Sequence, residues 1–237
     1  MAISKSEPLT VVITGVTRGL GRAMVDEFIR LGHTVCGCAR TKSQIAKLQF
    51  IYPAHDFQKV DVALNSEVAA WARRLASKHQ HPYILLNNAA IINNKGPLYS
   101  ADSRSFSREI DINIKGVFHV IRHFAPMMIK QRRGVIVNFT SRWGRHFEKE
   151  IASYCATKWA VTALTAALAE ELKPMQVAAI GLNPGVVKTA MLKKYLGSNA
   201  AFAAADYLSP SEWAKIAVPF ILRLGFKDTG KIRKVRI

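Results

Sequence analysis

The chain has 237 residues, 49% of them hydrophobic, and its formal net charge is +18. This length suits one large α/β domain, and no apolar run is long enough to predict a transmembrane helix. The polar first residues lack the apolar core of a signal peptide, and three cysteines are too few for a disulfide framework or a zinc site. We therefore expect a cytoplasmic protein without a structural metal.

The positive charge has two interpretations. It can attract anions, from a nucleotide cofactor to nucleic acid or a membrane surface, or it can form a solvated basic surface. The basic residues are scattered, apart from residues 131–133 and the tail at 231–236. Aromatic and basic residues are not interleaved as they are in a base-stacking surface. We therefore expect no nucleic-acid partner and no membrane partner.

Apolar runs alternate with amphipathic stretches along the chain. Predicted strands cover residues 9–14, 33–39, 58–62, 83–87, 134–140 and 176–182, and residues 231–237 can supply a last strand. Predicted helices run from the first glycine loop to Leu31 and over residues 64–79, 103–129 and 152–172. This alternation predicts βαβ units in an α/β fold: one Rossmann domain over residues 1–237, a doubly wound parallel sheet with helices on both faces.

Residues 185–210 interrupt that rhythm. The segment is rich in small residues but also contains Met191, Tyr195 and Phe202. We interpret it as an insert that covers the carboxyl edge of the sheet. Ser209 and Glu212 then form a capping box, with Pro210 at the first helical position, which predicts the start of the last helix.

Three glycines, Gly15, Gly19 and Gly21, lie between the first predicted strand and the first helix. Glycines at this place let the backbone approach a pyrophosphate, which the N-terminus of the helix then holds. The spacing differs from the commoner G-x-G-x-x-G pattern, and a plain tight turn is the alternative. The strand–turn–helix context favours a dinucleotide site.

Arg40 stands at the end of the second predicted strand, where NAD-binding proteins place a carboxylate for the ribose hydroxyl. A guanidinium there suits a 2′-phosphate, and Arg18 in the glycine loop can reach the same group. The cofactor prediction is therefore NADP(H). A solvated loop arginine is the alternative for Arg40.

Tyr154 and Lys158 are four residues apart in a predicted helix and share one face. A nearby ammonium favours the phenolate, so Lys158 is expected to lower the pKa of Tyr154 and make it a proton donor in carbonyl reduction. Ser141 follows a predicted strand at the ligand-binding edge and is expected to hydrogen-bond the substrate oxygen. An ordinary surface pair is the alternative for Tyr154 and Lys158.

With these residues in place, nearly the whole chain resembles a tyrosine-dependent short-chain dehydrogenase/reductase. The resemblance implies a catalytic set of Asn113, Ser141, Tyr154 and Lys158, with Asn113 holding a water and Lys158 holding the nicotinamide ribose. It implies a cofactor site formed by Gly15, Thr17, Arg18, Gly19, Leu20, Gly21, Arg40, Asp61, Val62, Asn88, Ala89, Lys158, Pro184, Gly185, Val187 and Thr189. It also implies a homodimer or homotetramer.

The chain departs from the family pattern at two places. Ala90 stands where the family usually has a glycine, and the basic C-terminal tail replaces a glycine-rich end. Residues 36–40, 143–145 and 154–160 are similar to plant-type NADPH-dependent pterin aldehyde reductases.

The substrate is expected to bind beyond Ser141. Aromatic side chains there suit a flat or aryl carbonyl compound. The predicted pocket residues are Trp143, His146, Phe147, Tyr195 and Phe202. Packing in the core or the insert is the alternative for most of them. The favoured function is NADPH-dependent reduction of a small aryl or cyclic aldehyde or ketone; a cyclic imine substrate and a non-catalytic NADP-binding sensor are the alternatives.

Overall fold

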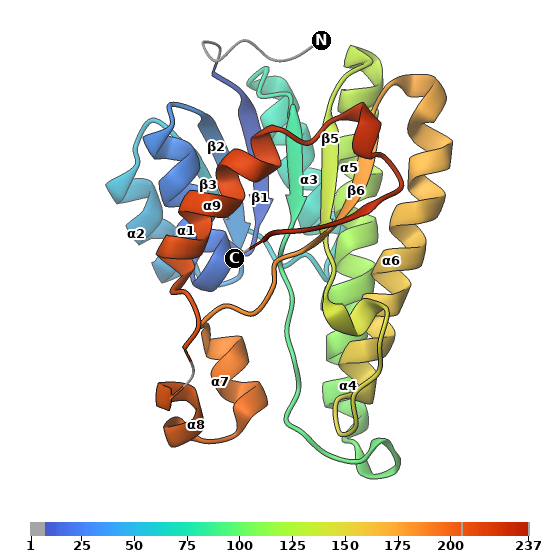
Figure 1. The fold of residues 1–237 in the computed structure, drawn as a ribbon. Coiled ribbons are helices and arrows are strands. Elements are labelled where there is room, and N and C mark those ends of the chain that lie inside the picture. The colour runs from blue at the N-terminus through green and yellow to red at the C-terminus, as the bar shows by residue number, and fades with distance from the viewer. Residues whose placement is uncertain (1–7, 205, 237) are drawn as a thin grey trace.

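A seven-stranded parallel sheet forms the centre of the molecule, with strand order β3-β2-β1-β4-β5-β6-β7 (Figure 1). The computed structural model describes residues 8–204 and 206–236. The strands are β1 (Thr10–Thr14), β2 (Thr34–Ala39), β3 (Asp56–Lys59), β4 (Ile84–Asn87), β5 (Val135–Phe139), β6 (Ala178–Asn183) and β7 (Ile232–Lys234). The predicted single-domain Rossmann fold is confirmed.

Both faces of the sheet are buried, because successive strand residues point to opposite sides. Val11 and Ile13 of β1 belong to one apolar cluster, and Val12 belongs to the other. The helices around them are α1 (Gly19–Arg30), α2 (Lys42–Ile51), α3 (Asn65–Ser77), α4 (Ser103–Ile110), α5 (Gly116–Gln131), α6 (Ala152–Leu172), α7 (Ala190–Leu196), α8 (Asn199–Ala204) and α9 (Pro210–Leu222). Helices α1, α2 and α9 pack on the first cluster, and α3, α5 and α6 pack on the second.

The third strand starts two residues earlier and ends three residues earlier than the predicted range 58–62. It pairs Cys36 with Asp56 and Ala39 with Lys59, so it ends where its partner β2 ends. The apolar residues Val60 and Val62, which made the later segment look like a strand, are buried in the turn that leads into α3.

The long helix predicted over 103–129 is interrupted. A π-helical turn, Asp111–Lys115, joins α4 to α5 and contains Asn113. Such turns often occur at functional sites because they re-aim side chains within a helix.

The predicted insert forms α7 and α8, two short helices that lie beyond the carboxyl ends of the strands (Figure 1). Thr189 caps α7 through a bond from Leu192 N to its Oγ1 (3.2 Å). The capping box of α9 is present, with Ser209 and Glu212 in the predicted roles.

The last predicted strand exists but is short. β7 pairs with Gly181 to Asn183 of β6, while Ile237 lies outside the described residues. The polar first residues, 1–7, also lie outside them. Within the described part of the chain, none of the helices is both long and apolar enough to span a membrane.

Candidate active site

The glycine loop between β1 and α1 leaves no room for side chains at two of its positions. Gly15 has φ of +77°, in the left-handed region, and a Cβ on Gly21 would lie 2.0 Å from Gly15 O. Backbone therefore lies where side chains would otherwise stand, at the N-terminus of α1. This cradle fits a pyrophosphate, as the helix N-terminus supplies unpaired N–H groups and a positive dipole end.

The end of β4 holds the glycine loop in place. Asn88 Nδ2 donates to Thr14 O (2.8 Å), and Thr14 Oγ1 accepts from the backbone N–H groups of Asn88 and Ala89, both at 3.0 Å. A buried amide row lies below: Asn87 Nδ2 donates to Asn138 Oδ1 (2.7 Å). These bonds fix β1, β4 and β5 relative to one another at the edge where a dinucleotide would lie.

The adenosine end of the predicted site has a charged cluster. Asp61 Oδ2 accepts a bond from Arg108 of α4 (2.6 Å), and its Oδ1 accepts from Ala63 N (3.0 Å). Burial opposes ionisation of Asp61, but Arg108, the Ala63 N–H and nearby Arg40 outweigh it and lower the pKa of that carboxyl. Arg18 and Arg40 are exposed. No local motif pointed to Arg108.

Tyr154 and Lys158 are both buried on the inner side of α6, with exposed fractions of 6% and 4%. Lys158 Nζ lies 5.5 Å from the centre of the Tyr154 ring and donates to Phe139 O at 2.8 Å. Burial lowers the pKa of Lys158 to about 8, against the opposing effect of the Glu109 carboxylate.

The expected depression of the Tyr154 pKa is wrong for the chain alone. Burial raises the pKa of Tyr154, and the Glu109 carboxylate raises it further. Removal of the phenol from water is the largest cause of this rise.

Ser141 follows β5 and caps a short 3₁₀ turn, Arg142–Gly144, accepting a bond from Trp143 N at 3.3 Å. Asn113 connects the π turn to two other segments: its Oδ1 accepts from Ile91 N (2.9 Å), and its Nδ2 donates to Ile91 O (2.9 Å) and Thr157 Oγ1 (3.1 Å). Thr157 immediately precedes Lys158. Asn113 therefore fixes the loop after β4 against the part of α6 that carries the lysine.

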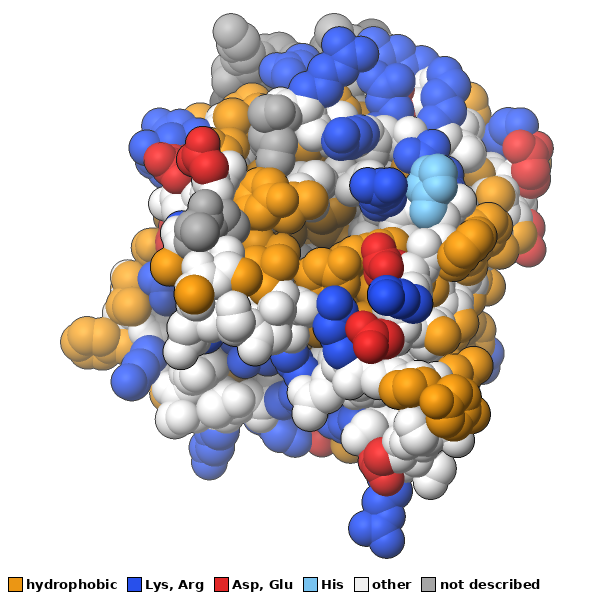
Figure 2. Space-filling model, turned by 60° about the horizontal axis from the view of Figure 1, so that its bottom comes forward, with side chains coloured by type: hydrophobic (Ala, Val, Ile, Leu, Met, Phe, Trp, Pro, Cys, Tyr) orange, Lys and Arg blue, Asp and Glu red, His pale blue; other side chains and the backbone are white. Residues whose placement is uncertain are grey.

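An apolar cluster packs around Tyr154, and we call it the tyrosine cover. It contains Tyr154, Cys155, Ile92, Ile151, Trp143, Met191 and Tyr195. The Trp143 ring lies 5.9 Å from the Tyr154 ring in an edge-on arrangement and 4.7 Å from the Tyr195 ring. Met191 Sδ is 3.8 Å from Tyr154 Oη. The face of the molecule that carries α7 and α8 has a hollow with apolar side chains in it, and Lys and Arg, with a few acidic side chains among them, lie along its right side (Figure 2).

A family model described as short chain dehydrogenase matches residues 9–199. The chain belongs to the short-chain dehydrogenase family. It is 39% identical over 224 residues to the NADPH-dependent pterin aldehyde reductase of Arabidopsis thaliana, covering 93% of this chain and 90% of that protein. It is 29% identical to dehydrogenase/reductase SDR family member 11 of Gallus gallus, covering 84% and 82% of the two chains.

A solved structure extends the similarity to three dimensions. Gluconate 5-dehydrogenase from Burkholderia cenocepacia, in complex with NADP and tartrate, superposes with a TM-score of 0.85 at 26% identity, over 96% of this chain and 93% of that one. The predicted family is confirmed, and this short-chain dehydrogenase is an oxidoreductase.

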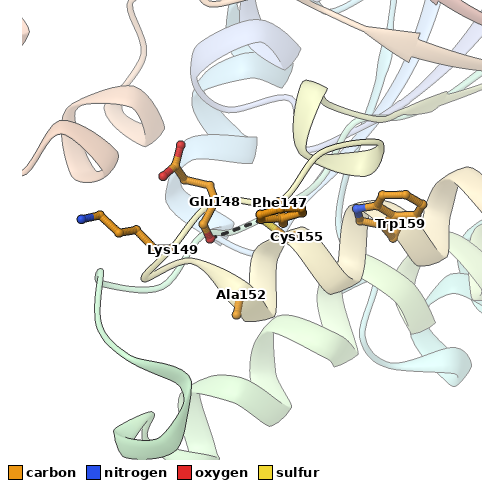
Figure 3. A pocket seen from close by; sticks show the side chains of 6 residues that line it. All are labelled: Phe147, Glu148, Lys149, Ala152, Cys155 and Trp159. Carbon is orange, nitrogen blue, oxygen red and sulfur yellow. Dashed lines mark hydrogen bonds between the residues drawn. The ribbon is translucent and has the colours of Figure 1, made fainter.

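Two of the five predicted pocket residues of this short-chain dehydrogenase, Trp143 and Tyr195, belong to the tyrosine cover. Phe147 does not: it is 91% exposed and lines a hollow with Trp159 and with Cys155, the one residue that this hollow shares with the cover (Figure 3). His146 is exposed. Phe202 of α8 lies near Lys188, whose Nζ is 5.6 Å from the ring centre.

The segment that carries the predicted cofactor residues Pro184, Gly185, Val187 and Thr189 leaves β6 through Asn183. Gly185, with φ of +79°, donates its N–H to Asn183 Oδ1 (3.0 Å). Pro184 O accepts from Trp213 Nε1 of α9 at 2.8 Å, and Val187 is buried. These contacts anchor the start of the segment while α7 extends from it over Tyr154. Sequence reasoning missed Met191, Ile92 and Glu109 as neighbours of Tyr154.

Proposed function

We propose that this protein reduces a small carbonyl compound to the alcohol at the Tyr154 site. The observation that carries the proposal is the buried Tyr154–Lys158 pair below Trp143, on the helix that follows Ser141. The cofactor is NADP(H). Exposed Arg18 and Arg40, with no carboxylate at the end of β2, suit its 2′-phosphate. The named relative is an NADPH-dependent reductase, and the gluconate 5-dehydrogenase binds NADP.

When bound, NADPH supplies a hydride to the carbonyl carbon. The residues Gly15, Gly21 and Arg40 bind and orient the cofactor. Ser141 Oγ hydrogen-bonds the substrate oxygen, and Tyr154 donates its hydroxyl proton to that oxygen as negative charge develops. Lys158 stays charged close to the phenol and stabilises the phenolate that remains. The tyrosine cover excludes water from Tyr154.

The substrate proposed is a flat aryl or cyclic aldehyde or ketone. Trp143 and Tyr195 offer ring faces and edges close to Tyr154, and aromatic surfaces of this kind bind planar rings. The relative that acts on a pterin aldehyde supports an aldehyde on a planar ring system. A cyclic imine is the alternative substrate at the same site, since C=N reduction needs the same hydride and proton.

We also infer a homo-oligomer located in the cytoplasm. Phe118 of α5 and Trp159 and Leu164 of α6 are exposed apolar side chains on outer helices, as an interface between copies requires. The three cysteines are free and buried, which agrees with a reducing compartment. Light scattering at micromolar concentration tests the oligomer, and a monomer would contradict it.

The function is tested by following NADPH oxidation with a panel of aryl aldehydes, pterin aldehydes, cyclic ketones and cyclic imines. Tyr154→Phe removes the proton donor, so turnover is expected to fall by at least about 100-fold. NADPH affinity, measured by fluorescence titration, is expected to stay nearly unchanged. Tyr99→Phe, at an almost fully exposed tyrosine, is the matched control and keeps full activity. Full activity in Tyr154→Phe would refute the proton-donor role, and NADPH binding without any turnover in the unmodified protein would favour a sensor.

A further inference from the structure

Glu109 is a buried carboxyl close to the catalytic pair. It lies near the end of α4 and is 0% exposed. Its Oε2 accepts two hydrogen bonds, one from Ser153 Oγ at 2.5 Å and one from Asn93 Nδ2 at 2.9 Å. Its other oxygen, Oε1, is buried without a hydrogen-bond partner among residues 8–204 and 206–236.

A buried carboxyl with an unpaired oxygen lowers the stability of the folded state. A buried carboxylate loses its hydration, and an unpaired buried oxygen adds to that cost. Burial accordingly raises the pKa of Glu109, although the bonds from Ser153 and Asn93 and the charges of Lys194 and Lys158 oppose the rise. A buried acid with an unsatisfied oxygen calls for a role that offsets this cost.

The neighbours of Glu109 belong to the reaction site. Ser153 immediately precedes Tyr154 on α6, and Asn93 follows Ile92 of the tyrosine cover. The charged and titratable groups facing Glu109 are Tyr154, Cys155 and Lys158 of α6 and Lys194 of α7. Its carboxylate thus acts on both members of the catalytic pair through a water-poor region, where charges interact strongly.

We propose that Glu109 is a positioning residue whose negative charge keeps Tyr154 and Lys158 in their proton-carrying forms, which biases this site toward carbonyl reduction. The proposal rests on the reductase function proposed above. Carbonyl reduction starts from the neutral phenol of Tyr154, whereas alcohol oxidation starts from its phenolate. A negative charge next to both groups favours the phenol and the ammonium, so it favours the reducing direction at a given pH.

The direction of the pH effect follows from the two shifts. The Glu109 carboxylate raises the pKa of Tyr154 and the pKa of Lys158. The Glu109 carboxylate therefore lets carbonyl reduction continue to higher pH, and alcohol oxidation begins only at higher pH. Below the pKa of Glu109 itself, the carboxyl is neutral and both effects disappear.

The test is Glu109→Gln, which keeps the size of the side chain and removes its charge. With an aldehyde that the enzyme reduces, the alkaline limb of kcat/KM is expected to move down by on the order of one pH unit. With the corresponding alcohol and NADP⁺, oxidation at neutral pH is expected to rise by up to about tenfold, for the same reason. A purely structural role would lower both directions together and leave both pH limbs in place, and that result would overturn the proposal.

A readout without turnover separates this proposal from the proposed function. The part of the phenolate absorbance that is lost in Tyr154→Phe reports the titration of Tyr154. In Glu109→Gln this absorbance is expected to appear at lower pH than in the unmodified protein. An unchanged titration would overturn the proposal even if carbonyl reduction is established, whereas absence of turnover in the unmodified protein refutes only the reductase function.

Two further variants complete the design. Asp111 lies two residues after Glu109 and pairs with Lys115. Asp111→Asn therefore removes a carboxylate without touching Glu109, and the pH dependence of kcat/KM in both directions is expected to stay as in the unmodified protein. Glu109→Met removes the buried charge with an apolar side chain of similar length and tests the proposal if the glutamine variant does not fold. It is expected to shift the Tyr154 titration in the same direction, and no shift would count against the proposal.

Discussion

The two halves of the active site are constructed differently. The cofactor half depends on the backbone: neighbouring backbone leaves no room for a Cβ at Gly15 or Gly21, Asn88 Nδ2 donates to Thr14 O, and Thr14 Oγ1 accepts from the N–H of Ala89. The substrate half depends on side chains from separate segments, with Trp143 after β5, Tyr154 on α6 and Met191 on α7. The glycine spacing of the first half is a local signal in the sequence, although Asn88 reaches the loop from the end of β4, whereas the second half exists only once the chain has folded.

This difference predicts how each half responds to substitution. The backbone cradle leaves no room for an added Cβ, so a glycine-to-alanine substitution there is expected to lower the affinity for the cofactor strongly. A side-chain cluster can repack, so truncation changes burial and pKa values more than binding. The substitutions below test that contrast, beginning with the largest expected effect.

Gly21→Ala is expected to weaken both NADPH and NADH by about 100-fold, since relief of a steric overlap of this kind costs about 1–3 kcal/mol. The added Cβ would lie 2.0 Å from Gly15 O and 2.6 Å from Asn88 Nδ2, so the loop has to move. Fluorescence titration with each nucleotide measures the effect. Gly225→Ala is the control, because its Cβ would meet no atom within 4 Å. Equal affinities in the two variants would contradict the backbone cradle.

Arg40→Asp is expected to weaken NADPH by at least about tenfold while leaving NADH much less affected, because only NADPH carries the 2′-phosphate. The effect is smaller than that of Gly21→Ala, as the exposed arginine is screened by solvent and salt. Arg223→Asp makes the same charge change at an exposed position after α9 and controls for net charge. Equal losses for both nucleotides would remove the 2′-phosphate assignment.

The same contrast explains what could be predicted from the sequence. The strand before Gly15 and the helix Ala152–Leu172 were predictable, because apolar periodicity and glycine placement are local signals. The third strand was misplaced because its end depends on pairing with β2, which is a long-range contact. Glu109 was missed because a glutamate among the polar residues of α4 has no local mark of burial; its partners Ser153 and Asn93 meet it only in the fold.

Phe147 shows the same limit within the candidate site. It is six residues from Ser141 and aromatic, so it was predicted to line the pocket together with Trp143. The chain places Trp143 against Tyr154 and directs Phe147 to a different hollow beside Cys155 and Trp159. Proximity to Ser141 in the sequence therefore does not determine whether a side chain packs against Tyr154 or lies elsewhere along α6.

Met191→Ala tests the substrate half and has the smallest expected effect on binding. Met191 Sδ lies 3.8 Å from Tyr154 Oη, and burial is the main cause of the raised pKa of that phenol. Truncation admits water to Tyr154, so the pKa of Tyr154 is expected to fall and the alkaline limb of the pH profile of reduction is expected to move to lower pH. NADPH affinity is expected to change by less than about threefold, because the side chains of the cover can repack. The phenolate titration defined by Tyr154→Phe measures this shift, and Met191→Leu, which keeps an apolar side chain over the hydroxyl, is the control. An unchanged titration in Met191→Ala would mean that Trp143 and Ile151 alone keep water from the tyrosine, and a large loss of NADPH affinity would mean that the two halves are not independent.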